Sequence, residues 1–101
     1  MRPIHTAQLD KVRPVLVLTR ELVRPYMGRV TVTPITTSVR HLSTEVPVGP
    51  TNGLDAHSVV SCDNIVTIPK DLLGDQIGFL LPDQEEALTT AIHAAFDLDR
   101  P

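Results

Sequence analysis

The sequence predicts a mainly β fold with a C-terminal α-helix, arranged as a small barrel or a strongly bent sheet. Short apolar runs rich in β-branched residues recur along the chain, with prolines and glycines between them. A helical pattern of apolar residues is confined to the C-terminal part. The chain has 101 residues, which is room for one core, so residues 1–101 are expected to form a single domain.

The strands are predicted from the apolar runs. The clearest run, Val15-Leu16-Val17-Leu18, predicts a buried strand over residues 13–19. A weaker alternating pattern predicts a strand over residues 3–9, which Asp10-Lys11-Val12 joins to the first. Further strands are expected over residues 29–35, 45–48, 57–62, 64–68 and 76–80. The runs at 57–62 and 64–68 fit either two strands or one bent strand.

Proline residues are expected to shape the edges of this sheet. Pro14, Pro34 and Pro47 lie in or beside predicted strands, and each lacks the backbone N–H that a strand donates. We therefore expect edges that are blunted or bent away at these positions. Residues 20–28 read as a loop, because Pro25 and Gly28 interrupt any regular pattern.

An amphipathic helix is predicted over residues 83–96. Pro82 suits a first helical position, or Asp83 caps the helix with Glu86 three residues later. The apolar stripe recurs at helical spacing and consists of Leu88, Ala91, Ile92, Ala95 and Phe96. Before the helix, residues 69–74 predict one tight helical turn closed by Gly74.

The composition excludes several classes of protein. The one cysteine, Cys62, rules out a disulfide framework and a cysteine-based zinc cage, and we expect it to be buried and inert. The four histidines have no metal-like spacing, so we expect no metal and no cofactor. No apolar run is long enough to cross a membrane, and the first residues lack a signal peptide. These features predict a cytoplasmic protein without a membrane partner.

The net charge of −3 hides two parts of opposite sign. Residues 1–40 carry seven Lys and Arg against two carboxylates, whereas residues 41–101 carry two against ten. A basic first part can bind an anion if folding gathers its charges, so the negative total does not exclude a nucleic acid as partner. An unevenly charged, solvated surface is the alternative.

Two places carry residue types suited to phosphate. Arg13 opens a strand directly before an apolar run, so its charge must stay at the rim, in solvent or in a cleft. Thr36-Thr37-Ser38 places three hydroxyls in a row at a strand end, and hydroxyls donate hydrogen bonds to phosphate oxygens. The alternatives are a rim ion pair between Arg13 and Asp10, and a turn whose hydroxyls cap their own backbone.

A series of short motifs follows along the chain in order. They are Ile4-His5-Thr6-Ala7-Gln8-Leu9-Asp10, Arg13-Pro14-Val15-Leu16-Val17-Leu18, Val32-Thr33-Pro34-Ile35-Thr36-Thr37-Ser38, Ser58-Val59-Val60-Ser61-Cys62-Asp63-Asn64 with Thr67-Ile68, and Gln76-Ile77-Gly78 before the closing helix. Together they resemble the MazF/PemK (Kid) family, the toxin halves of toxin–antitoxin pairs. The resemblance covers nearly the whole chain, and the Arg-Pro-Val strand and the Thr-Thr strand end are its most specific parts.

The resemblance implies an SH3-like β-barrel with a C-terminal helix, working as a homodimer. It also implies a sequence-specific endoribonuclease that cuts single-stranded RNA, or exposed loops of mRNA, rRNA or tRNA, without a metal. The products would carry a 2′,3′-cyclic phosphate and a 5′-hydroxyl. Translation and growth would stop, and a cognate antitoxin would neutralise the toxin.

By the same resemblance, the catalytic arginine of the family falls on Arg13 and the catalytic threonine on Thr36. Asp63 falls on an aspartate that some members use in substrate binding or proton transfer. The planar fork of Arg13 matches a phosphate, whereas a pKa above about 12 makes arginine a poor general base. Further RNA contacts are expected from Lys11, Thr37, Ser38, Arg40, Ser61 and Asn64.

Two positions depart from the family pattern. The loop between the first two strands shrinks to Asp10-Lys11-Val12, which would leave an open groove, and Ser61 stands where some members have an arginine. Two alternatives therefore stay open, a CcdB-type toxin that grips gyrase without cleaving RNA and an inactive relative. Retention of both Arg13 and Thr36 favours the nuclease.

Overall fold

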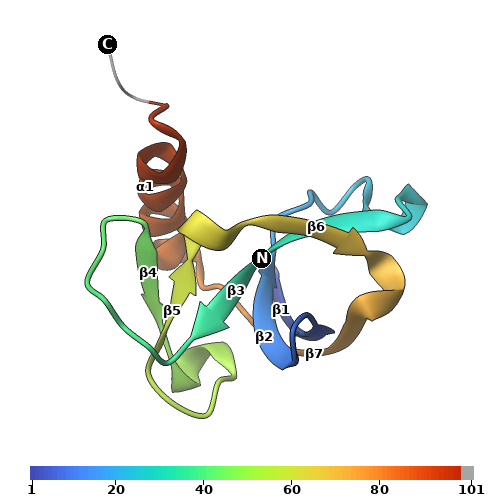
Figure 1. Cartoon of the computed structure of the whole chain (residues 1–101), viewed down its shortest axis with the longest axis horizontal. Coiled ribbons are helices and arrows are strands. Elements are labelled where there is room, and N and C mark those ends of the chain that lie inside the picture. Colours follow the sequence, from blue (N-terminus) through green and yellow to red (C-terminus); the bar gives the residue numbers. More distant parts are fainter. Residues whose placement is uncertain (99–101) are drawn as a thin grey trace.

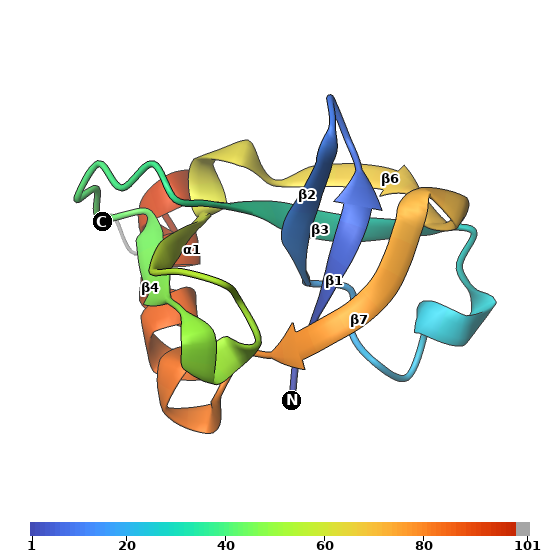
Figure 2. The ribbon, with the colours of Figure 1, turned by 90° about the horizontal axis from the view of Figure 1, so that it is seen from below.

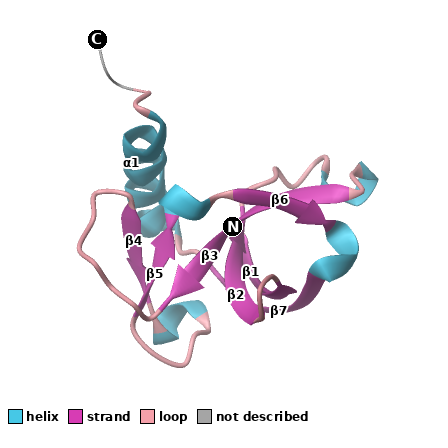
Figure 3. Ribbon diagram, viewed as in Figure 1, coloured by secondary structure: helices cyan, strands magenta, loops and turns pink. Residues whose placement is uncertain are grey.

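The computed structural model describes residues 1–98, which form a curled antiparallel sheet with one α-helix beside it (Figures 1 and 3). The strands are β1 (Pro3–Gln8), β2 (Val12–Val17), β3 (Arg29–Thr36), β4 (Glu45–Val48), β5 (Ser58–Ser61), β6 (Val66–Pro69) and β7 (Leu73–Phe79), and the helix is α1 (Glu85–Phe96). Short 3-10 turns cover Arg24–Tyr26, Pro50–Asn52, Cys62–Asn64, Lys70–Leu72 and Pro82–Gln84. The predicted mainly β fold with a C-terminal helix is confirmed.

Strand β3 is the centre of the sheet. The strand order is β4-β5-β3-β2-β1-β7, and β6 pairs with β3 outside this path. Along its length β3 pairs first with β6, then with β2 and finally with β5. The two ends of β3 therefore face different neighbours, which bends the sheet (Figure 1).

The prolines occupy positions that need no donor on one side. Pro14 pairs with Thr6 of β1, but pairing between β2 and β3 begins only at the next residue, Val15. Pro34 pairs with Val15, and pairing between β3 and β5 begins only at Ile35. Each proline is thus locally at an edge although its strand lies inside the sheet, which satisfies the restriction on prolines in strands.

Two apolar clusters lie on opposite faces of β2. Leu16 packs into a cluster beneath α1, while Val15 and Val17 pack into a second cluster with β3 and β6. A strand that is buried on both faces reads as a continuous apolar run, which explains the pattern seen in the sequence. The buried members of the first cluster are Ile4, Leu16, Ile35, Val46, Val48, Leu54, Val60, Cys62, Leu80, Leu88 and Ala91.

Three predicted boundaries and one predicted buried residue need correction or sharpening. The runs at 57–62 and 64–68 form two strands, β5 and β6, separated by a 3-10 turn. Gly74 does not close the turn before the last strand, because the turn ends at Leu72 and Gly74 already lies within β7. The helix begins at Glu85, after a 3-10 turn, and Phe96 is 57% exposed instead of lying in the buried stripe.

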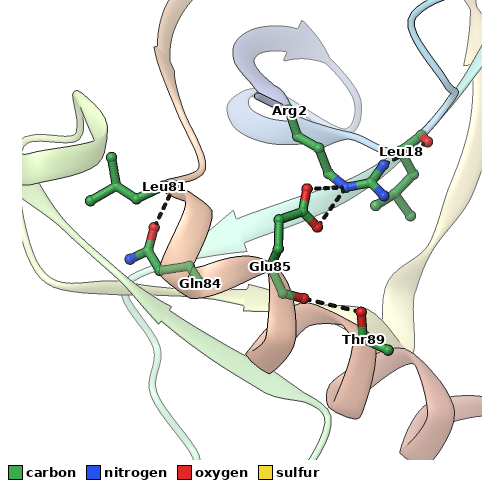
Figure 4. A network of polar contacts seen from close by, with 6 residues as sticks. All are labelled: Arg2, Leu18, Leu81, Gln84, Glu85 and Thr89. Atoms are coloured by element: carbon green, nitrogen blue, oxygen red, sulfur yellow. Dashed lines mark hydrogen bonds and ion pairs between the residues drawn. The ribbon is translucent and has the colours of Figure 1, made fainter.

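Contacts at the start of the helix differ from the predicted capping box. The side chain of Gln84, not Asp83, accepts a hydrogen bond from the Leu81 N–H, at 2.9 Å (Figure 4). Arg2 then ties the helix to the sheet, because its guanidinium contacts the Glu85 carboxylate at 2.9 Å and donates to the Leu18 carbonyl at 3.1 Å (Figure 4). The helix is thereby held to the start of β1 and the segment after β2.

The end of β7 lies beside the 3-10 turn that precedes β5 (Figure 2). A Cβ on Gly78 would overlap the Asn52 carbonyl oxygen, and one on Gly53 would overlap the Ile77 carbonyl oxygen. Gly53 also has φ +88°, which glycine adopts without strain. The two backbones approach this closely only because both positions are glycine.

Candidate active site

One open pocket of about 620 Å³ lies where the start of β2, the end of β3 and the turn after β5 meet. Its lining consists of Leu9, Asp10, Arg13, Pro34, Thr36, Ser38, Arg40, Leu42, Glu45, Ser61, Asp63 and Asn64. Seven of the nine side chains predicted to catalyse or bind RNA are among them. The other two, Lys11 and Thr37, do not line this pocket. Folding therefore gathers residues from three separate segments of the chain, 9–13, 34–45 and 61–64.

The side chain of Arg13 is held by a two-pronged ion pair. Its Nε donates to Asp10 Oδ1 at 2.8 Å, and one terminal nitrogen donates to Oδ2 at 2.9 Å. The hydrogen bonds from Arg13 hold the pKa of Asp10 well below its usual range, and the same contact raises the pKa of Arg13. This contact therefore favours folding above the ordinary Asp pKa and is lost only as the pH falls through the lowered value.

The pairing leaves part of the guanidinium available. Asp10 engages Nε and one terminal nitrogen, so the second terminal nitrogen can still donate toward the pocket. Arg13 is half-buried on β2, and its pairing with Ala7 of β1 fixes the position of its backbone. The rim ion pair that the sequence left as an alternative thus exists, and it orients Arg13 without consuming all of its donors.

Thr36 ends β3 with its hydroxyl in the pocket. Thr36 pairs with Val59 of β5, and its Oγ1 accepts a hydrogen bond from the Ser38 N–H at 3.1 Å. The hydroxyl proton remains able to donate, because the hydrogen bond to Ser38 uses only a lone pair. Ser38 lines this pocket with Thr36, whereas Thr37, in the bend directly after β3, does not.

The 3-10 turn after β5 supplies the polar wall of the pocket. Asp63 accepts a hydrogen bond from the Thr44 hydroxyl through Oδ2, at 2.7 Å. Asn64 donates to the Ser61 hydroxyl at 2.8 Å. These two contacts fix side chains that the sequence predicted only as separate candidates.

Asp10 and Glu45 line the pocket but were not predicted as site residues. The Glu45 carboxylate accepts hydrogen bonds from the backbone N–H groups of Arg40 and Leu42, each at 3.1 Å, and so holds the loop after β3. Neither acid stands in a pattern that points to RNA. The pocket consequently contains three carboxylates and two arginines, so its lining is not positively charged overall.

A second, more apolar pocket of about 410 Å³ shares Arg13 with the first. Thr37 lies here, together with Val12, Pro14 and Ile77. Arg13 therefore stands between two hollows, and a chain-like ligand that lies across it can enter both.

Cys62 is buried beside the pocket, 1% exposed, in the turn after β5. Burial, together with the nearby Asp63 charge, raises the pKa of its thiol to about 11. The prediction of a buried cysteine is confirmed.

We expect Cys62 to react with Ellman's reagent at pH 8 about 10²-fold more slowly in the folded protein than in the chain unfolded in guanidinium. The thiolate is the reactive form, and an ordinary cysteine has a pKa of about 8.5, so far less thiolate is present in the fold. Absorbance at the thionitrobenzoate band gives both rates. Equal rates would contradict the burial.

The sequence and the fold can be compared with those of known proteins. Residues 2–96 match the family described as PemK-like, MazF-like toxin of type II toxin-antitoxin system. The chain belongs to this toxin family. It is 68% identical over 99 residues to Endoribonuclease MazF3 of Mycobacterium tuberculosis, an alignment that covers 98% of this chain and 96% of that protein.

Solved structures agree with the family assignment. The M. tuberculosis toxin MazF-mt6 superposes with a TM-score of 0.96 at 67% identity, covering 97% of this chain and 99% of that one. An endoribonuclease in complex with its cognate antitoxin, from Mycobacterial species, gives a TM-score of 0.86 at 29% identity, covering 98% and 95%. MazF of Deinococcus radiodurans, at 15% identity and a TM-score of 0.80, shares the fold.

Two further findings concern residues 1–98. No helix in this range is both long and apolar enough to span a membrane. In the same range, no three side chains of His, Cys, Asp or Glu are grouped so as to hold a metal ion.

Proposed function

We propose that this member of the toxin family is a sequence-specific endoribonuclease that cleaves single-stranded RNA without a metal. It leaves a 2′,3′-cyclic phosphate and a 5′-hydroxyl, and so stops translation and growth. The observation that carries the proposal is the placement of Arg13 and Thr36 in one open pocket, with Asp10 holding the guanidinium in place. The match to proteins named endoribonuclease supports it.

The nucleophile in this reaction comes from the substrate. The ribose 2′-hydroxyl attacks its own phosphate, so the enzyme must stabilise the charge that builds on the non-bridging oxygens and help to move two protons. The free donor of Arg13 and the Thr36 hydroxyl bind those oxygens. Asp10 acts as a positioning residue, since it fixes the plane of the arginine fork.

Proton transfer is assigned to the opposite wall of the pocket. Asp63 accepts a hydrogen bond from Thr44 through one carboxylate oxygen and lines the same pocket as Arg13. We assign it the removal of the 2′-hydroxyl proton or a contact to the substrate. Asp10 is the weaker base, because its pKa is lowered by Arg13.

The RNA strand is proposed to run across Arg13 from one pocket to the other. Ser38, Arg40, Ser61 and Asn64 would contact it on one side and Thr37 on the other. The connection between β1 and β2 is only three residues long, Leu9-Asp10-Lys11, so we propose that an exposed loop of mRNA, rRNA or tRNA can enter. Lys11, which is exposed on this connection, would meet the RNA backbone outside the pockets.

The proposed partners follow from the family. A solved relative is described as an endoribonuclease in complex with its cognate antitoxin, and we propose that a cognate antitoxin neutralises this chain by covering the same groove. We propose a homodimer as the working form, since a domain of this size buries limited surface alone. Its site of action is the cytoplasm, where the RNA substrates are.

The decisive experiment is cleavage of total RNA in EDTA, with the ends of the products mapped. Cuts at one short sequence, with 3′ ends that resist tailing until the cyclic phosphate is removed, are the expected result. Loss of cleavage in EDTA would contradict the metal-independent reaction. Intact RNA together with inhibition of a gyrase reaction would replace the proposal with a CcdB-type function, and intact RNA alone would indicate an inactive relative.

A further inference from the structure

A cluster of cations lies at the end of β3 that is remote from the pocket. Arg20 and Arg24 come from the segment between β2 and β3, Arg29 is the first residue of β3, and Lys70 comes from the turn after β6. We call these four residues the basic end. The segment lies at the far side of the molecule from the loop after β3, as two views of the ribbon show (Figures 1 and 2).

Hydrogen bonds hold the basic end in a defined shape. Lys70 Nζ donates to the Arg24 carbonyl and the Lys70 N–H donates to the Gly28 carbonyl, each at 2.9 Å. The 3-10 turn Arg24–Tyr26 fixes the segment between them. The cations therefore lie on a segment whose backbone is held in place by hydrogen bonds.

The four cations of the basic end form no ion pairs with the described carboxylates. Within residues 1–98, no carboxylate oxygen lies within ion-pair distance of any of the four cations. Glu21 and Asp71 are the acids of these two segments, so four cations face two carboxylates. Arg24 Nε is buried without a hydrogen-bond partner, which leaves one donor of the cluster unsatisfied.

An exposed aromatic residue belongs to the same segment as these cations. Tyr26 is 89% exposed, and its neighbours Arg24 and Arg29 are three residues or fewer away along the chain. Arginines beside an exposed aromatic ring form the combination that binds single-stranded nucleic acid, because phosphates meet the charges and a base stacks on the ring. A contact between two copies about a two-fold axis would instead bring like charges together.

The pocket itself creates a need for such a surface. Three carboxylates outnumber the two arginines in its lining, and Asp10 already engages two of the three nitrogens of the Arg13 guanidinium. The long-range electrostatic attraction of RNA to the protein must therefore come from cations outside this pocket.

We propose that the basic end is a second RNA-binding surface, which holds the backbone of the substrate at a distance from the cut. This inference rests on the proposed function and adds to it a preference for RNA that extends well beyond the cut site. Arg29 and Thr36 are the two ends of β3, an eight-residue strand. At about 3.3 Å per residue they are about 23 Å apart, so an oligonucleotide that fills only the pocket cannot reach both.

The test compares two RNAs that contain the same mapped cut sequence, one of about 5 nucleotides and one of about 16. The variant is Arg20→Gln/Arg29→Gln, because both side chains are exposed and unpaired. Removing two phosphate contacts should raise KM for the long RNA about 10-fold and leave kcat and all constants for the short RNA unchanged. The slope of log Kd against log salt should fall by about 1.4 for the long RNA.

A matched control separates this surface from overall charge. Ala87→Glu/Thr90→Glu lowers the net charge by the same amount on the exposed face of α1 and should leave KM for the long RNA unchanged. Tyr26→Ala should raise KM for the long RNA several-fold with no effect on charge.

Three outcomes would overturn the inference. They are equal KM for long and short RNA in the unaltered protein, an equal loss in the control variant, and a loss of dimer or antitoxin binding without a change in RNA binding. Affinity is also measured with RNA that carries a 2′-deoxy nucleotide at the cut. Tight, length-dependent binding without cleavage would leave this inference standing while the proposed function fails.

Discussion

Replacing Arg13 with alanine should lower the single-turnover rate of RNA cleavage about 10²–10³-fold, the usual loss when one preorganised donor to a developing charge is removed. The pocket offers Arg13 and Arg40 as its cations, and Arg13 is the one held in a fixed orientation, by Asp10. Thr36 would then face the phosphate without an oriented guanidinium beside it. Cleavage of a fluorescently labelled RNA that contains the mapped site, at saturating enzyme, measures the loss.

Two further measurements show whether the loss is chemical. Arg13 lies at the surface in an ion pair, so Arg13→Ala should unfold at nearly the same temperature as the unaltered protein. Arg13→Lys keeps the charge without the planar fork, and it should recover only part of the rate. A rate for Arg13→Ala within about 3-fold of the unaltered protein would contradict the assignment, since one lost donor is expected to cost far more.

The sequence predicts the strands well because buried strand positions are occupied by apolar residues. Val15, Leu16 and Val17 are apolar on both faces, since each face of β2 meets a cluster. Element ends are different, because they depend on partners far along the chain. Gly74 reads as the end of a turn, but pairing with β1 extends β7 through it. Asp83 reads as a cap, but the side chain that accepts a hydrogen bond here is that of Gln84, from the Leu81 N–H.

The candidate site shows the same division. Arg13, Thr36 and Asp63 are predicted from motifs, and the bend of β3 from β2 toward β5 brings their segments together. Glu45 could not be found in this way, because it acts through backbone N–H groups that any residue carries. Thr37 belongs to the predicted hydroxyl cluster, yet it lies in the bend after β3 and lines the other pocket.

Asn52 is expected to be the most sensitive polar residue for stability. It is 1% exposed, accepts a hydrogen bond from the Gly49 N–H at 3.0 Å, and donates to the Phe79 carbonyl at 2.9 Å. It also donates to the side chain of Gln84, the residue directly before the helix. Asn52→Ala would leave several buried groups unpaired, at about 1–3 kcal/mol each, so the free energy of unfolding should fall by about 3 kcal/mol or more.

Urea unfolding followed by circular dichroism measures this loss, and a second amide provides the control. Asn64→Ala removes an exposed amide that contacts only Ser61 Oγ, and it should change the free energy of unfolding by less than about 0.5 kcal/mol. Asn52 lines neither pocket, so the folded fraction of Asn52→Ala should cleave RNA with an unchanged kcat. If both variants lose the same stability, the contacts of Asn52 do not hold β7, the turn before β5 and the helix together.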